Sequence, residues 1–205
     1  MKTICMFFIS IFTFFSLTFA QGGRNTELYI NTGFSLPSQP ETFSDYWNTG
    51  INIGGGLGFP FSSSLVFVGR VDYNNFSFDE EGFLKDNNFA GYGVSISGGS
   101  ASIVTITGNL KANLISTPNS VSPYFVGGIG YFKMTIDEFT ISALGESEKV
   151  EGDTESAFSV LFGVGVDIPA GETMSIYFEG KYGIGFTEDE SKKYFPLNAG
   201  IKIKL

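Results

Sequence analysis

The feature that most constrains this chain is a two-residue alternation of side chains over residues 157–186, AFSVLFGVGVDIPAGETMSIYFEGKYGIGF. A period of two is that of a β-strand, and a Pro169-Ala-Gly turn divides the segment into two halves. The segment is therefore predicted to form a β-hairpin. One of its faces is apolar, and the other carries glycines together with Asp167, Glu179 and Lys181. What each face contacts decides the fold.

The same alternation recurs along most of the chain, and helical periodicity is nearly absent. Eight strands are predicted, at about residues 27–36, 47–59, 64–77, 93–115, 123–137, 156–168, 173–187 and 195–205. Short turns alternate with longer polar segments, which cover roughly residues 37–46, 78–92, 138–155 and 188–194. An even number of antiparallel strands with alternately short and long connections is typical of a membrane-spanning barrel. The predicted fold class is therefore all-β, an eight-stranded antiparallel up-and-down transmembrane β-barrel.

The N-terminus has the pattern of a secretory signal peptide. Lys2 precedes a long apolar run, and small residues lead to a cleavage site after Ala20. We therefore expect a signal peptide at residues 1–20 and one barrel domain at residues 21–205. The single cysteine, Cys5, falls within the signal peptide. No disulfide, cysteine nucleophile or cysteine-bound metal is therefore expected in the exported part.

The glycine-rich face indicates which side of the strands lies inside. So many glycines would weaken a solvent-facing sheet, whereas an eight-stranded barrel is only wide enough for side chains to fill it. Charged residues of both signs share this face, and buried charges persist only when they are paired. We therefore predict a network of paired charges in the lumen. Its members are Arg70, Asp72, Lys133, Asp167, Glu179 and Lys181.

The opposite face is almost free of charge, which suits contact with lipid. A Lys or Arg on this face at the middle of a bilayer would cost about 2–4 kcal/mol, and a closed barrel leaves no strand edge unpaired in hydrocarbon. Aromatic residues near strand ends favour interfacial girdles, with Trp47, Phe59 and Phe61 as the strongest candidates. Ordinary strand propensity would also place aromatics there.

Three segments carry a family resemblance. They are Ser122-Pro-Tyr-Phe-Val-Gly-Gly-Ile-Gly-Tyr131, Phe162-Gly-Val-Gly-Val166 and the closing Asn198-Ala-Gly-Ile-Lys-Ile-Lys-Leu205. With the signal peptide, they resemble the porin-family β-barrel domain of outer-membrane proteins, the OmpA/OmpX-like and opacity-protein-like group of eight-stranded barrels. The resemblance implies a place in the bacterial outer membrane, after secretion across the inner membrane, and contact with its lipids and lipopolysaccharide. Many members end in Phe as part of an assembly signal, whereas this chain ends in Leu205.

The composition argues against several classes of function. The chain contains no histidine, which is the usual general base near neutral pH, and barrels of this kind that act as enzymes resemble one another in using one. We therefore expect neither enzymatic activity nor a cofactor. A formal net charge of −9 argues against nucleic-acid partners. The acidic clusters near residues 79–86, 146–155 and 188–190 lack EF-hand spacing, so they are interpreted as solvated loops and no metal site is predicted.

These observations favour a non-enzymatic integral outer-membrane protein with a filled lumen. It would act in envelope integrity, or in surface recognition and adhesion through the external loops 78–92 and 138–155, where an extracellular ligand could bind. We expect it to be a monomer. Two alternatives stay open: a small-solute porin, which the narrow lumen of an eight-stranded barrel disfavours, and a secreted soluble lipocalin-like ligand carrier, whose apolar face would point inward.

Overall fold

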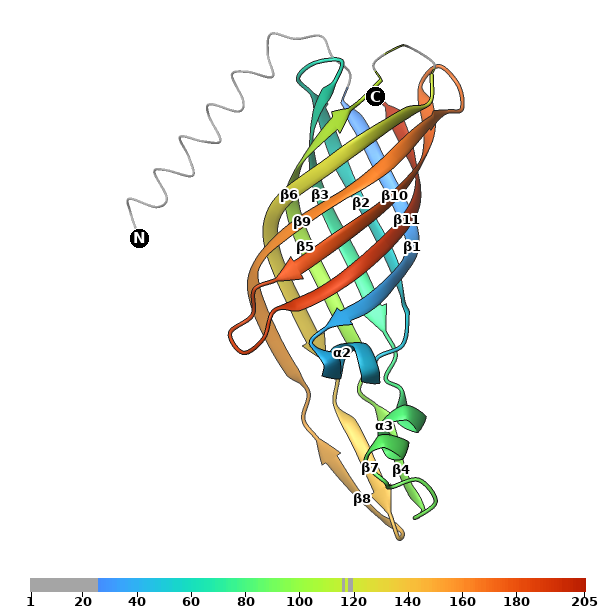
Figure 1. Ribbon diagram of the computed structural model, residues 1–205, viewed down its shortest axis with the longest axis vertical. Coiled ribbons are helices and arrows are strands. Elements are labelled where there is room, and N and C mark those ends of the chain that lie inside the picture. The colour runs from blue at the N-terminus through green and yellow to red at the C-terminus, as the bar shows by residue number, and fades with distance from the viewer. Residues whose placement is uncertain (1–25, 116, 118–119) are drawn as a thin grey trace, which may run out of the picture.

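The computed structural model describes residues 26–115, 117 and 120–205, so the predicted signal peptide lies outside the described residues (Figure 1). Eight antiparallel strands close into a barrel. They are β1 (Glu27–Gln39), β2 (Gly50–Pro60), β3 (Leu65–Phe76), β5 (Ala101–Asn113), β6 (Ser122–Ile136), β9 (Asp153–Pro169), β10 (Met174–Gly185) and β11 (Lys192–Lys204). Around the barrel they follow the order β1-β11-β10-β9-β6-β5-β3-β2. Because β1 pairs with both β2 and β11, every barrel strand has two partners. The predicted fold class is confirmed.

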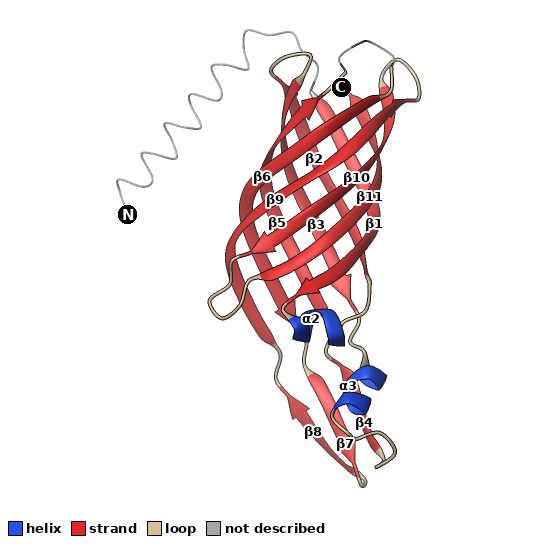
Figure 2. Cartoon of the chain, in the orientation of Figure 1, coloured by secondary structure: helices blue, strands red, loops and turns tan. Residues whose placement is uncertain are grey.

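The strands are joined by turns at one end of the barrel, whereas the connections at the other end include helices and a small sheet (Figure 2). One end, which we call the terminus end, holds the start of β1, the end of β11 and the turns β2–β3, β5–β6 and β9–β10. At the opposite end, the β1–β2 connection contains α2 (Glu41–Tyr46). The β3–β5 and β6–β9 connections there form a second body, which we call the extension. It contains α3 (Glu80–Asp86) and a three-stranded sheet in the order β4-β7-β8, made of β4 (Val94–Gly98), β7 (Phe139–Ala143) and β8 (Glu146–Val150).

One predicted strand is divided in two. The alternation over residues 93–115 predicts a single strand, but the chain turns between β4 and β5 at Gly98 and Gly99, whose φ angles are 93° and 71°. Glycine adopts positive φ without the clash that a Cβ would cause. As a result β4 pairs with β7 in the extension, whereas β5 pairs with β3 and β6 in the barrel wall.

An apolar cluster lies inside the barrel at the extension end. Inward-facing residues of β3, β5, β6 and β11 form it together with Phe43 of α2. Phe43 is only 2% exposed, and its ring centroid lies 5.2 Å from that of Phe76. The short helix α2 therefore covers this end of the barrel by burying one aromatic side chain in it. The members of the cluster are Phe43, Phe76, Ala101, Ile103, Phe132, Met134 and Tyr194.

Several inward-facing glycines lie beside large inward-facing rings. A Cβ added to Gly165 of β9 would overlap the ring of Tyr124 on the neighbouring strand β6. Gly200 stands in the same relation to Tyr177. Glycine at these positions makes room for a ring against the neighbouring strand, as close packing of an interior requires.

We expect Gly165→Val to lower the free energy of unfolding of the barrel by about 1–3 kcal/mol, the usual cost of overpacking an interior. Gly69→Val is the matched control, because a Cβ at Gly69 on the outer face of β3 meets no atom within 4 Å. Urea unfolding of both variants in lipid bilayers, followed by gel migration of unboiled samples, measures the difference. Equal midpoints for the two variants would contradict the packing described above.

Candidate functional site

Four charged side chains meet inside the barrel from β3 and β10, which are not neighbours in the wall. Arg70 Nη1 lies 2.6 Å from Glu179 Oε1, and Arg70 Nη2 lies 3.5 Å from Asp72 Oδ1. Lys181 Nζ lies 3.3 Å from Asp72 Oδ2 and 3.4 Å from Glu179 Oε1. All four residues are buried, and none is more than 8% exposed. Each charge has two partners of opposite sign, which is the arrangement that makes buried ions tolerable.

Neutral side chains from other strands complete this central cluster. Tyr124 of β6 donates a hydrogen bond to Glu179 Oε2 at 3.0 Å. Asn31 of β1 accepts one from Arg70 at 2.7 Å and donates one to Asp72 at 3.3 Å. The cluster thus links strands from all sides of the barrel.

A second group of charges lies between the central cluster and the terminus end. Lys111 Nζ lies 2.7 Å from Asp167 Oδ2, and Lys202 contacts the same carboxylate oxygen. Lys202 Nζ also lies 3.9 Å from Glu27 Oε1. Lys111 Nζ sits 3.8 Å from the ring centroid of Tyr124, a cation–π contact. Since Tyr124 also binds Glu179, it connects the two groups.

The structure brings together five of the six residues predicted for the lumen network. Arg70, Asp72, Glu179 and Lys181 form the central cluster, and Asp167 belongs to the second group. The partners of Asp167 are Lys111 and Lys202, which are not among the six. The same alternation of side chains nevertheless places both lysines on the inward face of their strands.

The prediction for Lys133 is wrong. Lys133 is exposed on the outer face of β6, opposite Ser156 of β9. The residues of β6 that point inward are Tyr124, Phe132 and Met134, so Lys133 lies on the opposite face from the predicted one. Both faces of β6 are mainly apolar. The position of its one lysine therefore does not show which face of the strand points into the barrel.

The three predicted interfacial aromatics occupy different places. Phe59 and Phe61 lie at the terminus end, where Phe61 is 50% exposed, and their interfacial role stays a prediction. Trp47 instead lies in the β1–β2 connection. Its Nε1 donates to the backbone oxygen of Gly99 at 2.9 Å, and its ring centroid lies 5.9 Å from that of Phe43. Trp47 therefore joins α2 to the base of the extension.

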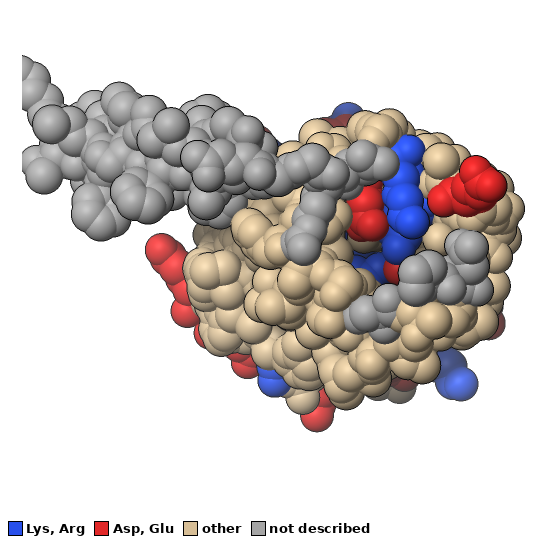
Figure 3. Space-filling model, turned by 90° about the horizontal axis from the view of Figure 1, so that it is seen from above, with Lys and Arg blue, Asp and Glu red and all other residues tan. Residues whose placement is uncertain are grey.

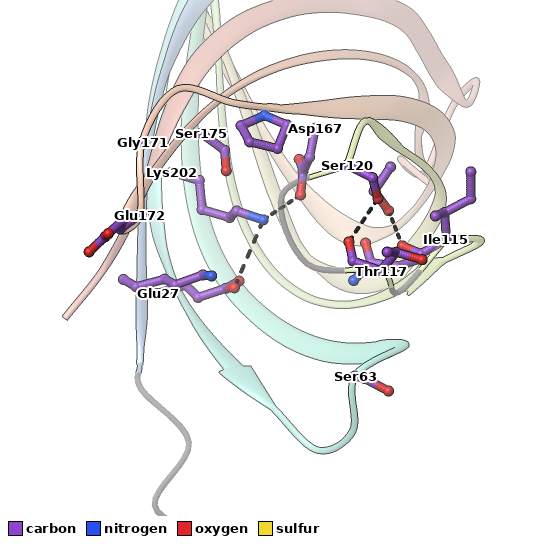
Figure 4. A pocket seen from close by; sticks show the side chains of 14 residues that line it. Glu27, Ser63, Ile115, Thr117, Ser120, Asp167, Gly171, Glu172, Ser175 and Lys202 are labelled. Carbon is purple, nitrogen blue, oxygen red and sulfur yellow. Dashed lines mark hydrogen bonds and ion pairs between the residues drawn. The ribbon is translucent and has the colours of Figure 1, made fainter.

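A pocket of about 250 Å³ opens at the terminus end (Figure 4). Seen from that end, basic and acidic side chains are visible within the mouth, which other residue types surround (Figure 3). The polar groups of the pocket come from several barrel strands and from the turns between them. Its lining includes Glu27, Asn113, Ser122, Asp167, Ser175 and Lys202. The second charge group therefore borders the pocket.

The extension is strongly acidic. Its two basic residues are Lys85 and Lys149, and Lys149 Nζ lies 2.8 Å from Glu138 Oε1. This hydrogen bond raises the pKa of Lys149, but the pair is largely exposed and contributes little to stability. The excess of carboxylates is left facing solvent. They include the exposed Glu81, Asp86, Asp137, Glu146, Glu148 and Glu151.

Within the part of the chain that the structure describes, no group of three or more His, Cys, Asp or Glu residues is placed to hold a metal ion. No helix in that part is both long and apolar enough to cross a membrane.

No family model and no curated protein matches the sequence. Solved structures do resemble the fold. Neisserial surface protein A (NspA) is 13% identical, with 88% of this chain and 97% of that chain covered and a TM-score of 0.60. Ail, the attachment invasion locus protein of Yersinia pestis, was solved in complex with the heparin analogue sucrose octasulfate. It is 14% identical, with 88% and 99% covered and a TM-score of 0.51.

A major outer membrane protein from Thermus thermophilus is 10% identical, with 88% of this chain and 99% of that chain covered and a TM-score of 0.50. Likenesses at such low identity show the fold alone. The chain has the fold of the eight-stranded outer-membrane β-barrels, as the resemblance in its sequence implied.

Proposed function

We propose that this chain is a non-enzymatic integral protein of the bacterial outer membrane. Its barrel anchors it among the lipids, its filled lumen conducts no solute, and its extension stands at the cell surface for recognition or adhesion. A contribution of the barrel to envelope integrity belongs to the same proposal. The protein acts as a monomer in contact with outer-membrane lipids and lipopolysaccharide, without a nucleic-acid partner.

The observation that carries this proposal is the apolar outer wall of the barrel. Large apolar side chains are exposed on that wall, including Phe34 at 61%, Ile51 at 66%, Ile129 at 58% and Leu197 at 51%. A continuous apolar band is a surface for lipid and a liability in water. A soluble ligand carrier would need the opposite arrangement, whereas here the paired charges lie inside.

The barrel interior favours an anchor over a pore. The central cluster crosses it with buried ion pairs, and the apolar cluster around Phe43 closes its extension end. Eight-stranded barrels have an interior that side chains can fill. This packing supports a closed lumen.

The extension supports a role in recognition. It projects from the end opposite the start of β1 and the end of β11 (Figure 1), and loops held on a rigid scaffold commonly carry binding functions. Ring contacts continue from the barrel into it, because Trp47 packs on Phe78, which in turn packs on Phe83 and Phe139. The acidic surface is thereby held in a fixed position relative to the barrel.

Surface exposure of the extension can be tested with a glutamate-specific protease on intact cells. We expect cleavage at the exposed Glu146 and Glu148 while the barrel survives, because those residues would face the medium. A variant with Glu146, Glu148, Glu151 and Glu155 all changed to Gln is the matched control and should resist cleavage there. Cleavage only after the cells are broken would contradict the proposed orientation.

A further inference from the structure

The pocket at the terminus end contains buried hydrogen-bond acceptors that lack a donor among the residues that the structure describes. Asp167 is 4% exposed, and its Oδ1 has no partner among the described residues, although its Oδ2 binds two lysines. Asn113 Oδ1 is likewise buried and unpartnered among them. Both residues line the pocket. Because buried polar groups are normally hydrogen-bonded, these unpartnered acceptors suit a ligand that donates hydrogen bonds.

The charges around the pocket cancel. Its lining holds the carboxylates of Glu27, Asp167 and Glu172 and the ammonium groups of Lys202 and Lys204. A third ammonium group, that of Lys111, binds Asp167 from the interior side. Counted together, these groups carry three formal charges of each sign, so their sum favours neither a cation nor an anion. The remaining lining is rich in hydroxyl groups, including those of Ser122 and Ser175.

We propose that this pocket binds a neutral, polyhydroxylated ligand, namely a single sugar residue. The volume of about 250 Å³ lies just below the range of pockets for drug-sized ligands, so it suits one sugar ring. Sugar hydroxyls both donate and accept hydrogen bonds, and can therefore satisfy Asp167 Oδ1 and Asn113 Oδ1 while they accept from lysine and serine. This site lies at the opposite end from the extension, so the inference is independent of what the extension recognises.

Two sources can supply the same chemistry: a free monosaccharide and the terminal residue of a polymeric glycan. Basic and acidic side chains are visible from outside in the mouth at this end of the barrel (Figure 3), so a chain attached to the bound residue has a way out. The free sugar and the glycan end are distinguished by comparing a monomer with an oligomer of the same sugar.

The test is a titration of ¹⁵N-labelled full-length mature protein in lipid nanodiscs with N-acetylglucosamine and with its β-1,4-linked tetramer. We expect saturable shifts of backbone amide signals at Asn113, Ser175 and Lys202, with weak affinity for the monomer. Tighter binding of the tetramer would assign the site to a glycan end, and equal binding would assign it to a free sugar. Absence of saturable shifts with both sugars would overturn the proposal.

Substitutions of pocket residues test whether the sugar binds in this pocket. Ser175→Leu, which places a larger side chain in the pocket, should weaken sugar binding at least tenfold, and Asn113→Leu, which removes one orphan acceptor, should weaken it severalfold. Thr173→Leu is the matched control, because Thr173 is exposed in the β9–β10 turn, two residues before Ser175, but does not line the pocket. Unchanged binding in both pocket variants would refute the site. Tighter binding of ethylammonium or acetate than of the sugar would refute the neutral ligand class.

Discussion

Glu179→Ala is expected to lower the free energy of unfolding of the barrel by about 3–5 kcal/mol, because it leaves two buried cations with a single carboxylate, Asp72, between them. Arg70 loses a contact of 2.6 Å and Lys181 loses one of 3.4 Å. The hydroxyl of Tyr124 loses its acceptor as well. Urea unfolding in lipid bilayers, read from the gel migration of unboiled samples, measures the change in stability.

Glu148→Ala is the matched control for this experiment, since Glu148 is exposed in the extension and makes no ion pair among the described residues. Lys181→Ala should destabilise the barrel by a similar amount, for the converse reason. The double variant Glu179→Ala/Lys181→Ala keeps equal numbers of buried cations and carboxylates, so it should cost less than the sum of the two single changes. Unchanged unfolding midpoints in both single variants would reject the central cluster as a source of stability.

The barrel itself was predictable because its signal is local. Each barrel strand alternates with a period of two, and the neighbours of six of the eight strands follow directly from antiparallel succession along the chain. The inward parity of Arg70, Asp72, Glu179 and Lys181 could also be predicted, because a charge on an otherwise apolar outer wall would be costly. What the pattern could not supply was the pairing of side chains across the interior.

The strand β6 shows where pattern analysis fails. Its inward residues include Tyr124 and Phe132, and its outward residues include Phe125 and Tyr131. Both faces are apolar because the interior changes character along the barrel, from charged groups in the middle to a ring-filled cluster at the extension end. The alternation along β6 therefore does not determine the face of Lys133, whereas the register with β5 and β9 does.

The covering of the extension end of the barrel by α2 could not be predicted from the sequence either. The sequence predicts a polar loop at residues 37–46. In the structure residues 37–39 continue β1, and residues 41–46 form α2, which buries Phe43 among side chains from four strands. Trp47 follows directly and is bonded to Gly99, which lies far along the chain. Such contacts form only when the barrel closes, so local sequence patterns do not predict them.

The face assignment of the whole wall can be tested at one position. Val164→Arg should impair insertion and destabilise the inserted barrel by about 2–4 kcal/mol, the cost of a cation on the lipid face near the bilayer midplane. Val164 is 55% exposed on the outer face of β9, opposite Gly180 in the middle of β10. The measurement is the fraction of protein that shows heat-modifiable migration after folding into lipid vesicles. Glu148→Arg, in the extension, is the control and should insert normally. Normal insertion of Val164→Arg would mean that this face does not contact lipid, and the barrel would then have to be a soluble one.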